Sequence, residues 1–128
     1  MKTEDAGQTW TNVFHSNEED MYYFNGISCS SESHCIAVAE GDDYIGCKAF
    51  VTFDGGATWE DTLTTSGVVP TTAVSLIGVD WVDDNEGWLV GTEKNGRLLT
   101  GIFYKTIDGG KTFSIGQVAN GVFFFLFA

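Results

Sequence analysis

The octet Thr52-Phe53-Asp54-Gly55-Gly56-Ala57-Thr58-Trp59 determines how this sequence is organised. Its pattern, Thr-x-Asp-x-Gly-x-Thr-aromatic, occurs twice more, at residues 3–10 and 106–113. Three copies in 128 residues indicate a repeat protein, and an internal repeat constrains the fold more than any other feature. The residues that define the pattern are Thr3, Asp5, Gly7 and Trp10 in the first copy, Thr52, Asp54, Gly56 and Trp59 in the second, and Thr106, Asp108, Gly110 and Phe113 in the third.

Each octet is predicted to form a tight turn between two antiparallel strands. The Asp at the third position can accept hydrogen bonds from backbone N–H groups two residues further on, which closes the turn. The Gly at the fifth position supplies a positive φ, which other residues resist. The closing aromatic residue starts the outgoing strand and buries a large apolar surface. The three Asp residues are therefore interpreted as turn formers, with a metal ligand or a catalytic acid as the alternative.

The octets resemble the Asp-box, also called the BNR repeat, of β-propellers such as sialidases, sortilin-type receptors, xyloglucanases and photosystem II stability/assembly factors. In that family the box joins the third and fourth strands of a blade. The phrase Gly78-Val79-Asp80-Trp81-Val82-Asp83-Asp84-Asn85-Glu86-Gly87-Trp88-Leu89-Val90-Gly91 is most similar to the photosystem II assembly-factor family. The resemblance implies an all-β chain of propeller blades, each a four-stranded antiparallel sheet. The first blade departs from the phrase, with Cys29 in place of the aromatic residue and Cys35 in place of Gly87.

The spacing of the octets also indicates blades. Asp5 and Asp54 are 49 residues apart (54 − 5), Asp54 and Asp108 are 54 apart (108 − 54), and a blade repeat is about 40–50 residues long. Within the first repeat we expect strands at residues 22–29, 35–39, 47–53 and 59–65. The chain then divides into a half-blade at residues 1–20, a blade at 21–66, a blade at 72–117, and an apolar first strand of a further blade at 118–128.

The last of these segments contains the apolar run Val122-Phe123-Phe124-Phe125-Leu126-Phe127-Ala128, which is typical of a strand buried on both faces. Translation past a natural splice or fragment boundary is the alternative. Two blades and two partial blades do not close a ring. We therefore expect either a fragment of a longer protein or a homo-oligomer joined through this run and the N-terminal half-blade.

The composition fits an all-β protein and restricts its partners. Sixteen Gly, one Pro and 14% aromatic residues suit many strands and turns. The net charge of −12 argues against nucleic-acid and anionic-membrane partners, which require clustered Lys and Arg. Protein and glycan partners remain. No signal peptide or transmembrane helix is recognisable.

The three cysteines allow two interpretations. A hairpin that places Ser28 opposite Ile36 places Cys29 opposite Cys35, where a disulfide is geometrically natural. Such a bond would indicate an oxidising compartment, outside the cell or in an organelle lumen, and would leave Cys47 unpaired. Three reduced, buried cysteines are the alternative. The spacing is poor for zinc, so we predict no metal.

No catalytic constellation is recognisable. The acidic turns at residues 40–43 and 83–87 do not fit a calcium-binding EF-hand loop and are interpreted as solvated turns. A glycosidase needs two carboxylates across a cleft, and eighteen acidic residues do not single out a pair. A sialidase needs several arginines to clamp its substrate, and this chain has only Arg97. His15 and His34 have no Ser or Cys partner at a recognisable spacing.

The sequence therefore predicts a non-enzymatic binding or assembly scaffold without a cofactor. A fragment of a carbohydrate-active propeller, either a glycoside hydrolase or a glycan binder, is the alternative. Aromatic residues exposed together around Tyr22, Tyr23 and Tyr44 would favour a glycan or peptide binder.

Overall fold

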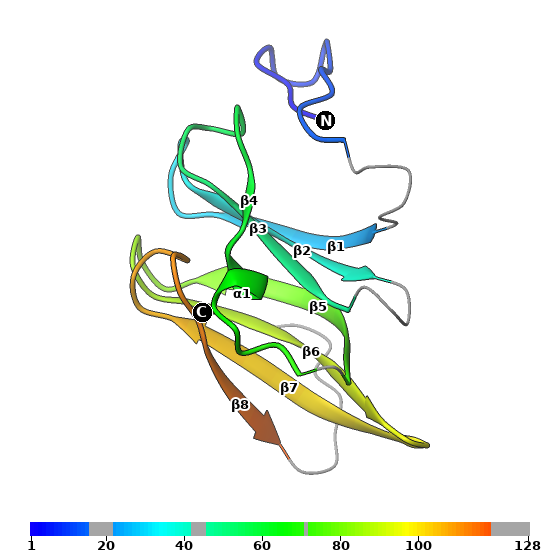
Figure 1. Ribbon diagram of the computed structural model, residues 1–128. Coiled ribbons are helices and arrows are strands. Elements are labelled where there is room, and N and C mark those ends of the chain that lie inside the picture. The colour runs from blue at the N-terminus through cyan, green and yellow to red at the C-terminus, as the bar shows by residue number, and fades with distance from the viewer. Residues whose placement is uncertain (16–21, 42–45, 71, 119–128) are drawn as a thin grey trace.

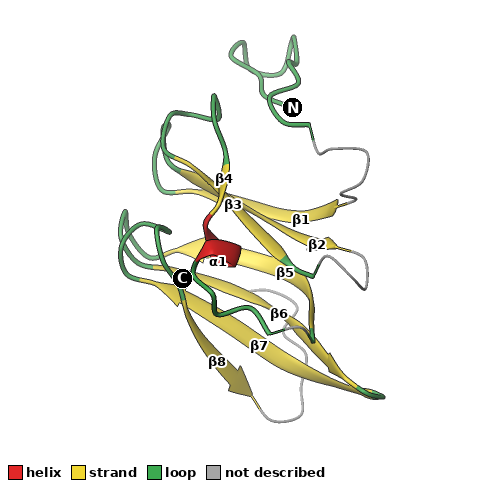
Figure 2. Ribbon diagram, in the orientation of Figure 1, coloured by secondary structure: helices red, strands yellow, loops and turns green. Residues whose placement is uncertain are grey.

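Two four-stranded antiparallel sheets make up most of the computed structural model, which describes residues 1–15, 22–41, 46–70 and 72–118 (Figure 1). Strands account for most of the regular structure in these ranges, and the helix is a single turn (Figure 2). Sheet 1 contains β1 (Tyr22–Cys29), β2 (Cys35–Gly41), β3 (Lys48–Thr52) and β4 (Glu60–Asp61), followed by the helix α1 (Thr62–Thr65). Sheet 2 contains β5 (Ala73–Trp81), β6 (Gly87–Asn95), β7 (Leu98–Thr106) and β8 (Ser114–Val118).

Each sheet is a meander in which neighbouring strands in the sequence are neighbours in space, with the orders β1-β2-β3-β4 and β5-β6-β7-β8. The second octet lies between β3 and β4, and the third lies between β7 and β8. The prediction of an all-β chain with four-stranded antiparallel blades is thus confirmed. The described residues form two adjacent blades and no closed ring.

Two details differ from the strands expected from sequence. The outgoing strand expected at 59–65 is reduced to β4, because Asp61 caps α1 by accepting a hydrogen bond from the backbone N–H of Thr64. Val118, expected in the last apolar strand, ends β8, where it pairs with Gly101. The rest of that predicted strand, residues 119–128, lies outside the described residues.

The two sheets have the same register. Ile27 pairs with Ala37 in sheet 1 as Val79 pairs with Leu89 in sheet 2. The β1–β2 register shifts between Phe24 and Gly26, and β5–β6 has a shift between Leu76 and Gly78, 52 residues later in each case (76 − 24, 78 − 26). A bulge at the same place in both repeats shows that they are copies of one structural unit.

The main hydrophobic core lies between the two sheets. One side of sheet 1, here called its inner face, contributes Ile36, Val38, Ala49 and Val51, and α1 adds Leu63. Sheet 2 contributes Leu76, Trp81, Leu89, Ile102, Tyr104 and Phe113. Burying each of the larger side chains provides about 1.5–3 kcal/mol, so this interface holds the blades together.

The N-terminal octet stands apart from both sheets in Figure 1, beyond the end of sheet 1. Lys2 and Thr11 form an isolated antiparallel bridge across it. Further along, Phe14 reaches the other side of sheet 1, where its ring centroid lies 4.9 Å from that of Phe50 and 5.4 Å from that of Phe24. No helix in the described part of the chain is long and apolar enough to span a membrane.

Candidate functional site

The second octet is closed by a network around the carboxylate of Asp54. Its Oδ1 accepts hydrogen bonds from the Thr52 hydroxyl and the Thr58 backbone N–H, both at 2.8 Å. Its Oδ2 accepts the Thr58 hydroxyl at 2.6 Å. The Thr52 hydroxyl oxygen in turn accepts the backbone N–H of Gly56 at 2.8 Å. Thr52, Asp54, Gly56 and Thr58 are thus joined in one network.

The other two octets repeat this network. Asp5 accepts from Thr3 and Thr9, and Asp108 accepts from Thr106 and Thr112, with distances of 2.6–2.9 Å. Each Asp accepts a hydrogen bond from the backbone N–H four residues further on. The prediction of a bond to the residue two positions further on was therefore wrong. The turn is wider than a simple Asx turn because two successive residues carry the chain around the carboxylate.

Those two residues are at the fourth and fifth positions, and both have positive φ. The φ values are 71° and 89° at Gly55 and Gly56, and 73° and 86° at Gly109 and Gly110. The requirement at the fifth position was expected, but the one at the fourth was missed, although the Gly-Gly pairs signal it. In the first octet the fourth position is Ala6, at a φ of 56° that strains a residue with a Cβ.

The hydrogen bonds hold all three carboxylates in the ionised form. The Thr58 hydroxyl and backbone N–H lower the pKa of Asp54 to about 2, and Thr9 lowers that of Asp5 to about 2 in the same way. Burial tends to raise the pKa of Asp108, but bonds from Thr112 and Thr106 outweigh it and the net pKa is lowered. Carboxylates with depressed pKa values and satisfied acceptors are poor general acids, and the hydrogen bonds that these three accept close their turns.

His34 links the two blades. Its Nε2 lies 2.7 Å from the Gly109 carbonyl oxygen, and its Nδ1 lies 2.7 Å from the Ser30 hydroxyl. A carbonyl only accepts, so Nε2 carries the proton and donates it. The ring also stacks on Phe53, with centroids 5.1 Å apart, and packs at 4.6 Å from Trp81.

The absence of a Ser partner for His34, expected from the sequence, is therefore wrong, because Ser30 lies four residues before it across the hairpin. Sequence spacing missed the contact because the turn brings the two side chains together. Together with the bond from His34 to Gly109, this contact ties the β1–β2 hairpin to the third octet.

Further polar contacts join the blades near the third octet. The Thr62 hydroxyl donates to the Gly110 carbonyl at 2.6 Å, and the Phe113 N–H donates to the Ser66 hydroxyl at 3.1 Å. The Trp81 indole N–H donates to the Ser28 carbonyl at 3.2 Å. The end of one blade is thereby attached to the Asp-box of the next.

The cysteines occupy two different environments. Cys29 and Cys35 are joined by a disulfide at the end of the β1–β2 pairing, where they lie directly opposite each other. Cys47 is a buried free thiol, 4.0 Å from the Tyr104 hydroxyl, and burial raises its pKa to about 11. A thiol with so high a pKa is unreactive at neutral pH.

The acidic turn at residues 83–87 is closed by its own hydrogen bonds. Asp83 Oδ1 accepts the backbone N–H groups of Asn85 and Glu86, both at 2.7 Å, and these bonds lower the pKa of Asp83. Glu86 forms an ion pair with Lys105 at 2.8 Å. Among the described residues no three His, Cys, Asp or Glu side chains gather as a metal site would require. The turn at residues 42–45, with Tyr44, lies outside the described residues.

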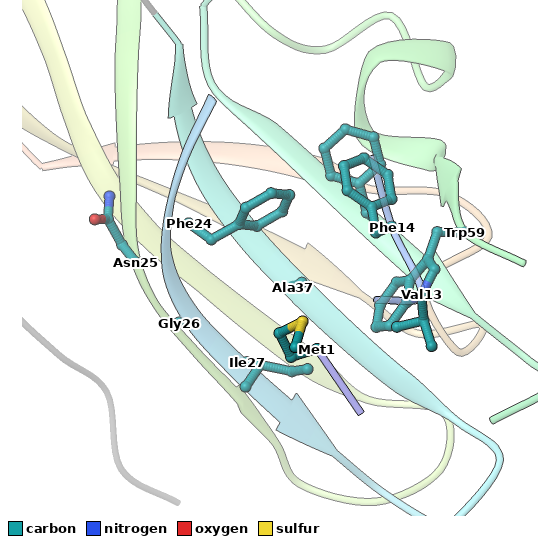
Figure 3. A pocket seen from close by; sticks show the side chains of 10 residues that line it. Met1, Val13, Phe14, Phe24, Asn25, Gly26, Ile27, Ala37 and Trp59 are labelled. Carbon is teal, nitrogen blue, oxygen red and sulfur yellow. The ribbon is translucent and has the colours of Figure 1, made fainter. Parts of the chain in front are cut away.

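An apolar cavity of about 460 Å³ lies on the side of sheet 1 that faces away from sheet 2 (Figure 3). It is lined by Phe14, Phe24, Ile27, Ala37, Phe50 and Trp59, together with Met1, Val13, Asn25 and Gly26, none of which has a charged side chain. The buried indole N–H of Trp59 finds no hydrogen-bond acceptor among the described residues, whereas that of Trp10 donates to the Gly7 carbonyl at 3.2 Å. Sequence reasoning missed this cavity, although Ala37 stands where the second blade has Leu89.

Comparison with known proteins identifies the repeat but not a close relative. The model of the BNR/Asp-box repeat family matches residues 50–61, a segment that includes the second octet and β4. No curated protein and no solved structure matches the chain. The chain therefore carries a BNR/Asp-box repeat within β-sheet blades.

Proposed function

We propose that this chain acts as a non-enzymatic binding or assembly scaffold built of Asp-box blades. The main support is that the three Asp-box carboxylates serve to close their turns. Each accepts hydrogen bonds from its own turn and holds no proton to transfer. The conserved geometry of the turns serves to present blades and loops at fixed positions.

Partners and compartment follow from charge and covalent structure. A net charge of −12 favours a protein partner with a basic surface, or a neutral glycan, over nucleic acid. The Cys29–Cys35 disulfide supports a secreted protein or one in an organelle lumen. A role like that of the photosystem II assembly factors rests on the phrase at residues 78–91 alone. Homo-oligomerisation through the N-terminal half-blade and residues 122–128 rests on the sequence, since the latter lie outside the described residues.

Glycan binding is the second candidate, whether by a lectin-like chain or by part of a carbohydrate-active propeller. Tyr23 is 60% exposed on β1 and offers the kind of aromatic surface on which sugar rings stack. Tyr22 lies beside it in the same strand and contacts Phe50, with ring centroids 5.6 Å apart.

The test combines a hydrolysis panel with a glycan array. The purified chain is incubated with fluorogenic sialosides, β-glucosides and xyloglucan oligosaccharides, and is applied separately to the array. The scaffold function predicts no turnover above buffer. Turnover that scales with protein concentration would show that the chain is an enzyme. Saturable glycan binding that is lost in Tyr23→Ala but kept in Ile107→Ala, another exposed site, would favour the second candidate.

A positive test uses a photo-cross-linking residue at position 23 or at position 107, which are both exposed. The scaffold function predicts one discrete, stoichiometric protein adduct from one of these positions in an extract of the source cells. Diffuse labelling of equal intensity from both positions would contradict it.

A further inference from the structure

The side of sheet 1 that faces away from sheet 2 matches, in register, a face that packs against a neighbouring sheet. This outer face, defined by Phe24, Ile27, Ala37 and Phe50, has the same register positions as the face of sheet 2 that packs on sheet 1. The equivalent residues of sheet 2 are Leu76, Val79, Leu89 and Tyr104, since Phe24 pairs with Ala39 as Leu76 pairs with Gly91, and Ala37 pairs with Phe50 as Leu89 pairs with Tyr104.

The two equivalent faces differ in what covers them. In sheet 2, Leu76, Leu89 and Tyr104 are each 0% exposed, because the inner face of sheet 1 lies on them. In sheet 1, Phe24 is 48% exposed and Ile27 is 63% exposed, beside the cavity of about 460 Å³. Ala37 and Phe50 are each 9% exposed, so this face, which is built on the same plan as a blade interface, is open at Phe24 and Ile27.

The N-terminal segment covers one part of this outer face, in the way that the end of sheet 1 covers sheet 2. Lys2 bridges Thr11 as Val51 pairs with Glu60, 49 residues later in each case (51 − 2, 60 − 11). The same offset places Phe14 at the position of Leu63 (63 − 14), which is fully buried between the sheets. Phe14 contacts Phe50 and Phe24 on the outer face.

The N-terminal octet thus takes the place of the turn between a third and a fourth strand, with Lys2 and Thr11 at the positions of Val51 and Glu60. The other inner-face positions, those of Ile36, Val38 and Ala49, are not filled by any described residue. The open part of the outer face corresponds to those positions.

We propose that the outer face of sheet 1 docks three antiparallel strands of a further Asp-box blade, which pair beside residues 1–3 and complete a blade with residues 1–15. The docking strands present an uncharged aliphatic face, as the inner face of sheet 1 does toward sheet 2. This proposal rests on the scaffold function and names the kind of partner that the scaffold takes.

Two observations favour this occupant over a second copy or a charged ligand. No charged side chain lines the cavity, so its side chains favour an apolar occupant over an acidic or basic peptide. Each chain carries a net charge of −12, so two copies pressed face to face repel each other. A blade attached beside residues 1–15 instead repeats an interface that the chain already contains.

The experiment supplies the missing strands from the chain itself. In the extended protein, residues 22–51 are copied in place of Met1 and Lys2, so that Val51 of the copy takes the register position of Lys2. Thermal unfolding is measured for the original and extended proteins, each with and without Ile27→Asp in the original sheet. The matched control extension carries Ile36→Asp and Val38→Asp within the copied strands.

Docking predicts that the extension raises the unfolding midpoint by about 5–10 °C and that the control extension does not. It also predicts that Ile27→Asp lowers the midpoint more in the extended protein than in the original, where Ile27 is exposed. A second extension uses residues 73–105, the equivalent strands of sheet 2. It provides an independent test in case the first extension misfolds.

The proposal is overturned if neither extension raises the midpoint, or if Ile27→Asp has the same effect with and without the extension. It is also overturned if the original chain is a dimer by light scattering and Ile27→Asp makes it a monomer, because the occupant would then be a second copy. None of these outcomes depends on glycoside turnover or on cross-linking to a partner. Docking can therefore fail while the scaffold function stands.

Discussion

The two blades are copies of one unit, yet they fasten the same hairpin in different ways. At the last pair of β1 and β2, Cys29 and Cys35 are joined by a disulfide. At the equivalent pair of β5 and β6, the Trp81 ring lies over Gly87 so closely that a Cβ there would be 2.6 Å from the ring. A covalent bond in one repeat replaces aromatic packing in the other.

The neighbours of each hairpin explain this difference. Trp81 is buried because His34 and the Ser28 carbonyl of the adjacent blade cover it, so its apolar surface contributes to stability. Cys29 lies exposed on the outer face of sheet 1, where no described residue of another blade covers it. The comparison teaches that the hairpin end can be fastened by aromatic packing where an adjacent blade covers it, and by a covalent bond where the described residues leave it uncovered.

The largest expected effect concerns the faces of the two sheets. Leu89→Ala should lower the free energy of unfolding by about 2–5 kcal/mol, because it opens a cavity between the sheets. Ile27→Ala removes an exposed side chain on the outer face of sheet 1 and should change it by about 0.5 kcal/mol or less. Urea unfolding followed by tryptophan fluorescence measures both, and equal losses would contradict the assignment of an open and a covered face.

The disulfide should have the next largest effect. Its loss in the double variant Cys29→Ser and Cys35→Ser should reduce stability by about 2 kcal/mol, as expected for closing so short a loop. Adding a phosphine reductant to the original protein should reproduce that loss, and the double variant should not respond to the reductant. A reductant response that persists in the double variant would implicate Cys47 instead.

Much of this comparison could be predicted from the sequence, because the octets repeat visibly. Thr52, Asp54 and Gly56 predict a turn that is closed by hydrogen bonds between residues close in the sequence. Such local interactions are the ones that a single sequence predicts best. The register that sets Cys29 opposite Cys35 also follows from a short hairpin. The link from His34 to Gly109 could not be predicted, since it joins residues 75 positions apart and depends on how one blade packs on the next. The cavity at Ala37 could not be predicted for the same reason, because its size depends on which segments pack on the outer face of sheet 1.

Acid should weaken all three Asp-boxes. The pKa of Asp54 falls from an ordinary 3.8 to about 2 on folding, so its contribution is complete above about pH 4 and is lost as the pH falls through 2. The urea midpoint should therefore decrease between pH 4 and pH 2. In Asp54→Asn the decrease should be smaller, because one of the titrating groups is gone, and an unchanged pH dependence would show that other carboxylates account for it.

A smaller change in stability tests whether the N-terminal segment packs on sheet 1 in the same way as the end of sheet 1 packs on sheet 2. Val13 holds the position of Thr62 at the offset of 49 residues (62 − 13), and it lies beside Gly56 in a small surface cavity. Val13→Thr should provide a hydroxyl for the Gly56 carbonyl, as Thr62 does for Gly110, and increase stability by about 0.5–1.5 kcal/mol. Val13→Ser and Val13→Ala serve as controls with and without the hydroxyl. A gain in neither hydroxyl variant would mean that the two junctions are built differently.

The smallest effect concerns the one Asp-box whose fourth position is not glycine. Ala6 has a φ of 56°, and its counterparts Gly55 and Gly109 have φ values of 71° and 73°. Ala6→Gly should relieve the strain of a Cβ in the left-handed region, while the added freedom of the unfolded chain offsets part of the gain, leaving a net increase of about 0.5 kcal/mol. Ala57→Gly is the control, because Ala57 lies in the second octet without a positive φ and its replacement should only destabilise. Since the N-terminal octet stands apart from the sheets, hydrogen exchange of the Gly7 and Thr9 amides measures this local gain more directly than global unfolding does. Slower exchange of these two amides in Ala6→Gly, with unchanged exchange in the second octet, is the expected result, and faster exchange would mean that Ala6 is not strained.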